Sequence, residues 1–540
     1  MNGGEVVVQT LLSRQVDTVF FVSGGTYVTV LEALSRNQDR IRCVPTRLES
    51  SATFAAEAYA ALARKPACVL VSRSPGATNA AIGIHTARQS SRPLVLIIGD
   101  IPRRFKGREA FQEIDYRSMY APIAKAVFEV SAFDDVAAVV ARALDVSVSA
   151  RPGPVVVSIP TDVLDGDTGN PPIPPPPGPA RAGPDPHAIE EAASLLDGAE
   201  RPLIIAGELV GFERAHAPLV ALAESSGAGV LAAYRQADVF PNDHPAWLGQ
   251  LTLDRAPHIE RALDECDLIA AIGTRFDSVT TGDYGLLRDH HRLIMVHPDS
   301  SVFSQWQPRV SIASNVLGAM EAMARACTSK PPPSRLSWCN ALHRRESDFA
   351  AARPEKVHGR VDMRTVVDTF RARAAPDTIV VSDAGTFGRW LQRHYPHTLP
   401  DTSLGPVSGA MGYGLPGGIG ASIAHGSRPV FVWVGDGGFL MTGHEAATIV
   451  QEGLPIKIVV CDNSAWGSIL VGQQKRFTGW DFGTRLRSPD FATLARGYGM
   501  SAFSVSASAE FEPALDAAMN ENGPALIHLE LDPRDASPFG

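Results

Sequence analysis

Cysteine is scarce in this chain of 540 residues, and its spacing excludes several kinds of site. No two cysteines form a CxxC pair, and several lie within apolar runs. This pattern favours reduced structural thiols in a cytoplasmic protein over a disulfide framework or a thiolate metal site. The cysteines are Cys43, Cys68, Cys266, Cys327, Cys339 and Cys461.

Basic segments and long apolar runs are also missing. The net charge is −9, and no block of lysine and arginine is present, which argues against nucleic acid and anionic membranes as partners. No apolar run reaches the roughly 18 residues that a membrane-spanning helix needs. The N-terminus, MNGGEVVVQTLL, has neither the positive flank nor the apolar core of a signal peptide. We therefore expect a cytoplasmic protein.

Aromatic residues make up only 7% of the chain, whereas alanine, glycine and valine are plentiful, which suits layered α/β domains. Short apolar runs such as ACVLVSRSPG, LVLIIGD and IKIVVCDN alternate with segments of helical periodicity. The runs are continuously apolar and do not alternate, which predicts parallel strands covered on both faces. The predicted fold class is α/β with three doubly wound parallel sheets.

Two proline-rich segments divide the chain, NPPIPPPPGPARAGPDP and TSKPPPSR. Proline blocks regular structure and favours extended spacers, so we place domain boundaries there. The predicted parts are an N-terminal domain (1–169), a linker (170–186), a central domain (187–327), a second linker (328–356) and a C-terminal domain (357–540).

The stretch VFVWVGDGGFLMTGHEAATIVQEGLPIKIVVCDNSAWG carries the clearest chemical signal. Asp436 and Asn463 each follow an apolar run, and ligands of parallel sheets bind beyond the carboxyl ends of strands. Their oxygens suit Mg2+, which binds few protein groups together with substrate phosphates. A helix expected to begin near Thr442 would direct its N-terminal dipole the same way.

Three glycines next to Asp436 would let the backbone approach a phosphate. The simpler interpretation is a turn at Gly-Asp-Gly and a helix cap at Asn463. Two strand ends of matching chemistry favour a diphosphate bound through a divalent ion. The glycines are Gly435, Gly437 and Gly438.

This stretch resembles the diphosphate and metal signature of the thiamine diphosphate (ThDP) enzyme superfamily. The resemblance implies three domains, named PYR, central and PP. It implies that Mg2+ is bound by the side chains of Asp436 and Asn463 and by the backbone carbonyl of Ala465. Trp466 and Gly467, which follow, are then expected at the cofactor.

The resemblance also implies a catalytic glutamate, and RLESSATFAAEAYA supplies Glu49. In ThDP enzymes this carboxyl group hydrogen-bonds the aminopyrimidine ring and promotes formation of the ylid, while the cofactor carries the chemistry. The alternative is an acid favoured by the dipole at a helix N-terminus. Glu57, two turns later, is expected to be a surface or capping acid.

In SGAMGYGLPGGIGAS, Met411 matches the apolar wedge that bends the cofactor, and Gly409 matches the carbonyl that accepts the aminopyrimidine N–H. Enzymes of this kind build each active site between two subunits. We therefore expect a homodimer with Glu49 and Asp436 contributed by different chains, or a homotetramer made of two such dimers.

Further stretches resemble acetolactate synthase over nearly the whole chain. VSGGTYVTVLEAL matches its glycine pair near the thiazolium, which includes Gly25, and REAFQEIDYRSMYAPIAKAV brings Gln112 near the reaction centre. The resemblance implies ThDP- and Mg2+-dependent decarboxylation of a 2-oxo acid, with transfer of the acyl carbanion to a carbonyl acceptor.

Several departures concern candidate substrate-contacting residues: Thr26, Arg73, Phe111 and Gly472. Gly472 stands where acetolactate synthases usually have tryptophan. NSAWGSILVGQQ instead resembles benzaldehyde lyase, yet Thr26 replaces the histidine of that enzyme. Arg73 replaces a small residue, and it would hold a substrate carboxylate or pair with a nearby acid.

Other interpretations stay open at this point. They are a lyase or carboligase acting on 2-hydroxyketones, a simple 2-oxo acid decarboxylase, and a catalytically silent ThDP-binding protein. His85 and His444 are candidate proton carriers or structural histidines. FAD is a candidate structural cofactor of the central domain, because RFDSVTTG is retained, although AGELVG and LGQLTLDRA depart from the flavin-binding pattern.

Overall fold

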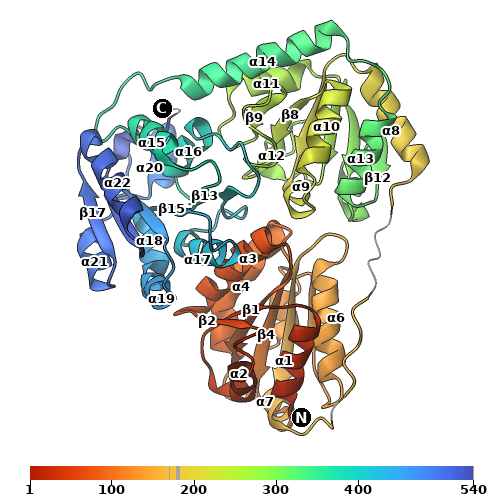
Figure 1. The fold of residues 1–540 in the computed structure, drawn as a ribbon, viewed down its shortest axis with the longest axis vertical. Helices are drawn as coiled ribbons and strands as arrows, with labels where there is room; N and C mark the ends of the chain where they lie inside the picture. The colour runs from red at the N-terminus through yellow and green to blue at the C-terminus, as the bar shows by residue number, and fades with distance from the viewer. Residues whose placement is uncertain (170, 178–182, 539–540) are drawn as a thin grey trace.

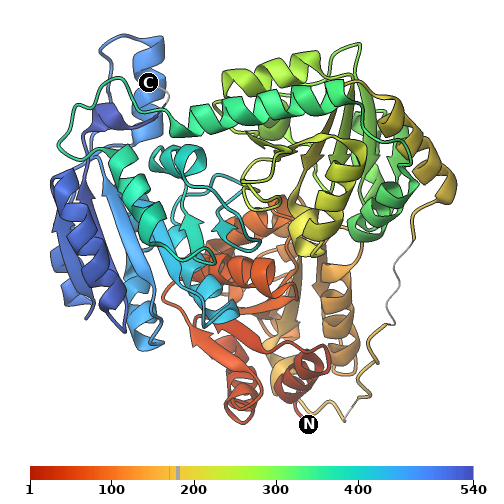
Figure 2. The same cartoon turned by 45° about the horizontal axis from the view of Figure 1, so that its top comes forward.

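Three parallel sheets organise the chain in the computed structural model, which describes residues 1–169, 171–177 and 183–538 (Figure 1). Each sheet has six strands, and the strands within it pair in parallel. Helices cover both faces of each sheet (Figures 1 and 2). The predicted fold class, three doubly wound parallel sheets, is confirmed.

The N-terminal sheet has the order β2-β1-β3-β4-β6-β5. Its strands are β1 (Thr18–Phe21), β2 (Arg42–Pro45), β3 (Ala67–Ser72), β4 (Leu94–Asp100), β5 (Ala126–Glu129) and β6 (Pro154–Pro160). The accompanying helices are α1 (Gly3–Ser13), α2 (Val28–Ser35), α3 (Glu49–Ala63), α4 (Arg73–Gln89), α5 (Tyr116–Tyr120), α6 (Val136–Val148) and α7 (Thr161–Asp165).

The central sheet has the order β12-β11-β10-β7-β8-β9. Its strands are β7 (Pro202–Ala206), β8 (Gly229–Ala232), β9 (Trp247–Gln250), β10 (Leu268–Ile272), β11 (Arg292–Val296) and β12 (Val310–Ile312). The accompanying helices are α8 (Pro186–Gly198), α9 (Glu208–Phe212), α10 (His216–Ser226), α11 (Pro257–Glu265), α12 (Ser278–Thr281) and α13 (Val316–Ala326).

The C-terminal sheet has the order β14-β13-β15-β16-β18-β17. Its strands are β13 (Ile379–Ser382), β14 (Ser403–Leu404), β15 (Val430–Gly435), β16 (Lys457–Asp462), β17 (Ser501–Val505) and β18 (Ala525–Glu530). The accompanying helices are α15 (Met363–Arg373), α16 (Phe387–His394), α17 (Gly414–Ala424), α18 (Asp436–Thr442), α19 (Ala446–Gln451), α20 (Gly467–Arg476), α21 (Phe491–Gly497) and α22 (Phe511–Asn520).

The proline-rich segments differ from each other in structure. The predicted linker 170–186 lies partly outside the described residues. The predicted linker 328–356 contains a helix of 19 residues, α14 (Pro333–Ala351). This helix lies on the outside of the molecule and connects the central part to the C-terminal part (Figures 1 and 2). Its N-terminal proline explains the difference, because proline is well tolerated in the first turn of a helix. The exact domain limits stay a prediction.

Helices α3 and α17 join the N-terminal and C-terminal sheets. Any side chain at Gly420 would overlap the carbonyl oxygen of Ala55, so glycine is what allows the two helices to approach this closely. The rings of Phe54 and Tyr413 meet edge to face across the contact, with centroids 5.6 Å apart. One apolar core therefore extends through both sheets.

Glu57 lies inside this contact, not at the surface or in a cap as expected. Only 2% of it is exposed, and its Oε2 accepts a hydrogen bond of 2.6 Å from the hydroxyl of Tyr413. Burial raises the pKa of Glu57, although the positive charge of Arg92 opposes the shift. The expectation failed because α3 is covered on this side by a helix more than 350 residues later in the chain.

Two further observations concern the chain as a whole. All six cysteines are free. Within the described parts of the chain, no helix combines the length and apolarity needed to cross a membrane.

Candidate active site

Asp436 and Asn463 lie side by side because β15 and β16 are neighbouring parallel strands, with Gly435 in register with Cys461. Asp436 is 3% exposed and Asn463 is 9% exposed. The helix expected near Thr442 instead begins at Asp436 itself, as α18. Asp436 therefore occupies the first turn of a helix, where the unpaired backbone N–H groups gather.

The two side chains open into a cavity of about 350 Å3 between the C-terminal and central sheets. Every residue predicted to bind the metal or the cofactor at this end of the chain lines it. These residues are Gly409, Met411, Gly435, Asp436, Gly437, Gly438, Asn463, Ala465, Trp466 and Gly467. The structure thus brings together two sequence motifs, one before and one after α17.

Glycine is required at particular points of the cavity wall. A side chain at Gly437 would overlap the ring of Trp466, and a Cβ atom at Gly467 would lie 2.7 Å from Nδ2 of Asn463. Gly409 has a φ of +72°, a backbone conformation that favours glycine. The absence of side chains at Gly437 and Gly467 lets Trp466 and Asn463 pack beside the carboxyl ends of the strands.

The electrostatics of the cavity favour a cation. Burial and the neighbouring charge of Asp462 raise the pKa of Asp436 to about 6. The hydroxyl oxygen of Ser488 lies 3.3 Å from Oδ2 of Asp436 and 2.7 Å from Oδ1 of Asp462. Among the residues that the structure describes, no lysine or arginine forms an ion pair with Asp436. The buried carboxyl group of Asp436, with the amide oxygen of Asn463 beside it, fits a hard divalent ion such as Mg2+.

Asp383 is a site residue that the sequence reasoning missed. It follows β13 and is fully buried, and its Oδ2 accepts hydrogen bonds from the backbone N–H groups of Gly412 (3.0 Å) and Gly414 (3.1 Å). Burial raises its pKa to about 6. It thereby fixes the loop that carries Met411. The available signal was TIVVSDAG, an apolar run that ends in an acid as β15 does.

The central sheet supplies the opposite wall, which the sequence did not indicate. Arg235 donates hydrogen bonds to the carbonyl oxygens of Ser382 (2.9 Å) and Asp383 (3.2 Å). Arg389 forms an ion pair of 2.8 Å with Asp254. These contacts join the two walls of the cavity, although the paired residues lie more than 100 residues apart in the sequence.

The residues predicted in the N-terminal part do not line this cavity. Glu49 begins α3, and its Oε2 accepts a hydrogen bond of 3.0 Å from Asn79. Thr26 is buried, with its hydroxyl oxygen 2.8 Å from that of Ser72. Gly25 is exposed, and a Cβ atom there would meet no neighbour. These residues form a second cluster at the carboxyl end of the N-terminal sheet.

Arg73 directly follows Ser72 of this cluster, and the loop after β4 carries two further candidates, Phe111 and Gln112. Arg73 begins α4 with a φ of +33°, and its Nε is buried without a hydrogen-bond partner among the described residues. No ion pair with a nearby acid is formed by Arg73 within that part of the chain. Phe111 is 79% exposed, and Gln112 next to it has a φ of +67°.

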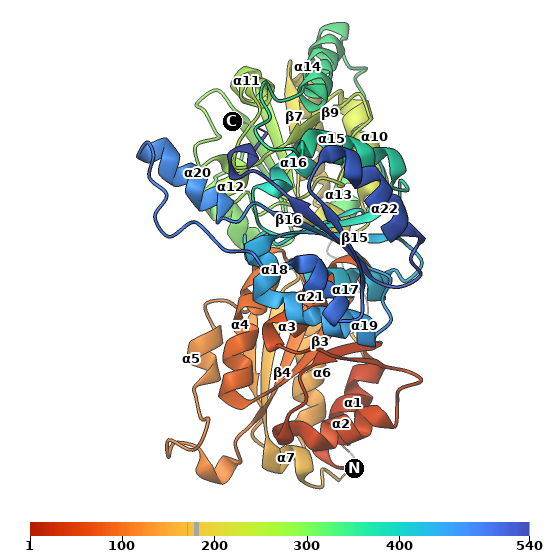
Figure 3. The same ribbon diagram turned by 90° about the vertical axis from the view of Figure 1, so that its left-hand side faces the viewer.

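Three remaining candidates lie outside the cavity lining. Gly472 is on the exposed face of α20, a helix that projects from the body of the molecule in Figure 3. A Cβ atom at Gly472 would meet nothing within 4 Å. His85 is on α4, and the Nε2 atom of His444 lies 3.5 Å from the carboxylate of Glu445.

Comparison with known proteins identifies the class of this fold and cavity. Three family models of the thiamine pyrophosphate enzymes match in chain order: the N-terminal TPP binding domain at residues 1–119, the central domain at 189–323 and the C-terminal TPP binding domain at 383–529. Together with the full-length relatives described next, these matches show that the chain belongs to the thiamine diphosphate-dependent enzymes.

Several similar curated proteins are acetolactate synthases. The chain is 30% identical to a probable acetolactate synthase large subunit of Methanocaldococcus jannaschii, over 100% of this chain and 93% of the relative. It is also 30% identical to the acetolactate synthase isozyme 2 large subunit of Escherichia coli K12, over 98% and 96% of the two chains. It is 31% identical to the large subunit of Corynebacterium glutamicum, over 98% and 86%. The protein is an enzyme that resembles these large subunits along its whole length.

Proposed function

We propose that this enzyme uses ThDP and Mg2+ to decarboxylate a 2-oxo acid and to join the acyl group to a carbonyl acceptor, an activity of the acetolactate synthase type. The observation that carries the proposal is the buried pair of Asp436 and Asn463 at the carboxyl ends of adjacent strands. Full-length similarity to acetolactate synthase large subunits supports it.

In this proposal, the residues that line the cavity bind different parts of the metal and cofactor. Asp436, Asn463 and the carbonyl oxygen of Ala465 hold Mg2+, and the glycines around Asp436 leave space for the diphosphate. Met411, whose loop is tied down by Asp383, supports the bend of the cofactor. When bound, ThDP supplies the electron sink that protein side chains lack.

Glu49 is proposed to exchange a proton with the aminopyrimidine ring through its carboxylate, which Asn79 orients. Because Glu49 does not line the cavity of its own chain, we propose that a second copy of the chain supplies it. The functional unit is then a homodimer, or a homotetramer of two such dimers, with each site between two subunits.

A mixing experiment tests the shared site. Glu49→Gln and Asp436→Ala variants should each be inactive, yet a hybrid dimer of the two keeps one site with both native residues. With random pairing, co-expression should restore about a quarter of the native activity. Two differently tagged copies of Glu49→Gln, expressed together, are the matched control. An inactive mixture whose hybrid dimers are shown to form would place both residues in one chain and contradict the shared site.

The cluster at the carboxyl end of the N-terminal sheet is proposed to contact the substrate. The buried Nε of Arg73, which has no hydrogen-bond partner in the described chain, supports a role in binding a substrate carboxylate. Gly25, Thr26, Phe111 and Gln112 would lie around the reacting carbons. Gly472, which stands where the acetolactate synthase pattern has tryptophan, would leave room beside the substrate.

A substrate panel separates the proposed reaction from its alternatives. Condensed 2-hydroxy-3-oxo acids from pyruvate with a second 2-oxo acid are the expected result. Cleavage of benzoin would indicate a lyase of the benzaldehyde lyase type, and release of aldehyde alone from pyruvate or benzoylformate would indicate a decarboxylase. Binding of ThDP without any turnover in the panel would favour a silent binding protein.

We place the enzyme in the cytoplasm, which the six free cysteines support. Fractionation of the producing cells, with detection of the chain by antibody, checks this assignment.

A further inference from the structure

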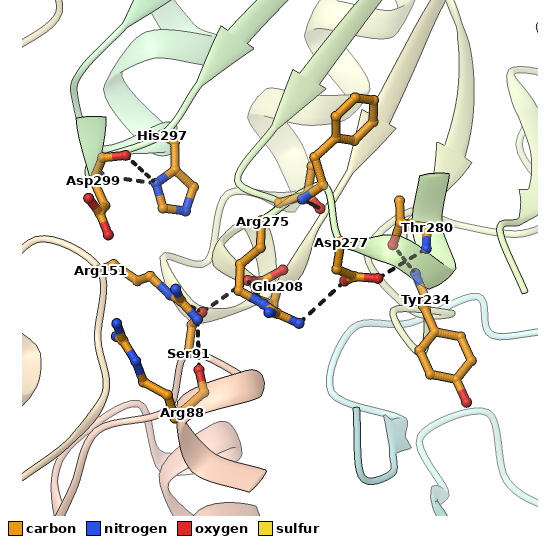
Figure 4. A network of polar contacts seen from close by, with 12 residues as sticks. Arg88, Ser91, Arg151, Glu208, Tyr234, Arg275, Asp277, Thr280, His297 and Asp299 are labelled. Atoms are coloured by element: carbon orange, nitrogen blue, oxygen red, sulfur yellow. Dashed lines mark hydrogen bonds and ion pairs between the residues drawn. The ribbon is translucent and has the colours of Figure 1, made fainter. Parts of the chain in front are cut away.

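A polar network occupies the carboxyl edge of the central sheet, which is where an open parallel sheet ordinarily binds its ligand (Figure 4). Glu208, directly after β7, is at its centre and has only 7% of its side chain exposed. Its Oε1 accepts a hydrogen bond of 2.9 Å from the hydroxyl of Ser91 and lies 3.8 Å from Nε of Arg275. The carboxylate is thus enclosed by groups that would otherwise attract an anion.

Arginine side chains from two sheets converge on this carboxylate. Nε of Arg151 donates a hydrogen bond of 2.9 Å to Ser91, and NH1 of Arg92 donates one of 3.4 Å to the backbone oxygen of Glu208. NH2 of Arg275 lies 3.4 Å from Asp277. Burial, opposed by the charge of Glu208, lowers the pKa of Arg151 to about 10. The negative charge of Glu208 therefore offsets the free-energy cost of burying these arginine side chains away from water.

The strand-end glycines are used for packing here. A side chain at Gly207 would overlap Thr274, and a Cβ atom at Gly273 would lie 3.1 Å from Leu209. The two turns that follow β7 and β10 therefore pack tightly against each other. His297, after β11, is also completely buried. A dinucleotide phosphate placed at this edge would meet a buried carboxylate and closed turns, so these residues do not fit FAD.

We propose that Glu208 is a built-in anion that takes the place of a ligand phosphate at the carboxyl edge of the central sheet. As a result, the central domain of this enzyme binds no FAD or other diphosphate-bridged nucleotide. The edge instead docks the N-terminal sheet through Ser91 and Arg151. This inference does not depend on the proposed reaction, and its test requires no turnover.

The first experiment uses the native chain. The enzyme, purified without added flavin, should show no flavin absorbance after denaturation, and titration with FAD or ADP should give no saturable binding by fluorescence or calorimetry. A yellow enzyme that carries about one FAD per chain would overturn the inference. So would saturable binding of ADP that competes with FAD.

The second experiment removes the charge of Glu208 and keeps its shape. In Glu208→Gln the amide oxygen can still accept from Ser91, while Arg275 loses its buried anion. We expect affinity for ADP to rise by at least about tenfold, because the substitution removes a like charge that would repel the phosphates. Glu224→Gln, at an exposed acid on α10 of the central domain, is the matched control and should change nothing.

Folding of the variant is checked independently. Amide exchange should become faster near Ser91 and in α9 of Glu208→Gln, while the C-terminal sheet keeps native protection. If the folded variant binds ADP no better than the native chain does, Glu208 is not what excludes the anion and the proposal fails. If Glu208→Gln does not fold, Glu208→Asp, which retains the charge, should fold and stay unable to bind ADP; saturable ADP binding by it would equally refute the proposal.

Discussion

Asp462 and His528 form a buried pair on the adjacent strands β16 and β18, with Nε2 of the histidine 3.0 Å from Oδ2 of the aspartate. The other oxygen of Asp462 accepts hydrogen bonds from the backbone N–H of Ser464 (2.8 Å) and the hydroxyl of Ser488 (2.7 Å). Burial opposes ionisation, but these hydrogen bonds hold the pKa of Asp462 below its ordinary value. Asp462 thereby fixes the turn that presents Asn463.

Replacement of His528 should therefore disturb the metal site without touching it. In His528→Leu, the buried Asp462 loses one partner, and we expect a loss of about 1–3 kcal/mol in the free energy of unfolding. The Mg2+ concentration needed for half-maximal cofactor binding should rise several-fold. Denaturant unfolding and Mg2+ titration followed by tryptophan fluorescence measure the two effects. His187→Leu, at an exposed position, is the control. Unchanged Mg2+ dependence would show that the pair is only structural.

Asp436 should make the metal-free enzyme less stable as the pH rises. Its folded pKa, about 6, lies above its ordinary value of 3.8, so between these values the folded state binds more protons than the unfolded state. Stability contributed by the protonated form is present below about pH 4 and is lost as the pH rises through 6.

We therefore expect Asp436→Asn to stabilise the metal-free enzyme at pH 7 by about 1–3 kcal/mol. Added Mg2+ with ThDP should stabilise the native enzyme and leave the variant unaffected. Thermal unfolding at pH 5 and pH 7, first in chelator and then with Mg2+ and ThDP, measures both. A variant that is less stable than the native enzyme at pH 7 would contradict this account of the buried charge.

The buried hydrogen bond between Glu57 and Tyr413 should couple the N-terminal and C-terminal sheets. Tyr413→Phe leaves the carboxyl group of Glu57 without this donor, so we expect a loss of about 1–3 kcal/mol in unfolding free energy. The double variant Glu57→Gln with Tyr413→Phe should lose less than the sum of the single variants. Urea unfolding of all four proteins completes the cycle. Additive losses would mean that the two groups act independently.

Close packing of α3 on α17 should make Gly420 intolerant of any side chain. Gly420→Ala would force Cβ into the carbonyl oxygen of Ala55, and we expect at least about 2 kcal/mol of destabilisation. Gly472→Ala is the matched control, because its Cβ would meet nothing within 4 Å on an exposed helix. There alanine should raise unfolding free energy by about 0.5–1 kcal/mol. Equal effects at the two positions would argue against the close approach.

The grouping of the residues proposed to bind the metal and the diphosphate could be predicted from sequence, because these residues lie in short, regular patterns. Asp436 and Asn463 each end a continuous apolar strand, and the carboxyl ends of parallel strands necessarily meet at one edge. Met411 and Gly409 could be placed through the family resemblance. The start of α18 was misplaced because Asp-Gly-Gly is a poor helix sequence, and only its position after β15 makes it one.

The roles of Asp383 and Arg235 could not be predicted from such patterns. Asp383 acts through backbone groups 29 and 31 residues later, and Arg235 acts through a carbonyl 147 residues later. Contacts over such separations leave no periodic pattern in the sequence, because they depend on how the sheets pack against each other. Glu57 was expected to be a surface or capping acid for the same reason.

The sequence by itself determined the three parallel sheets and the oxygen-bearing side chains at two of their strand ends, because continuous apolar runs and strand-ending polar residues are local properties of the chain. Only the tertiary structure decided that Glu57 is buried, that Asp383 anchors the Met411 loop and that Glu208 closes the central sheet. These outcomes depend on which distant helix or arginine covers each carboxyl group. That is settled by domain packing, where a buried charge must find its partner across the fold.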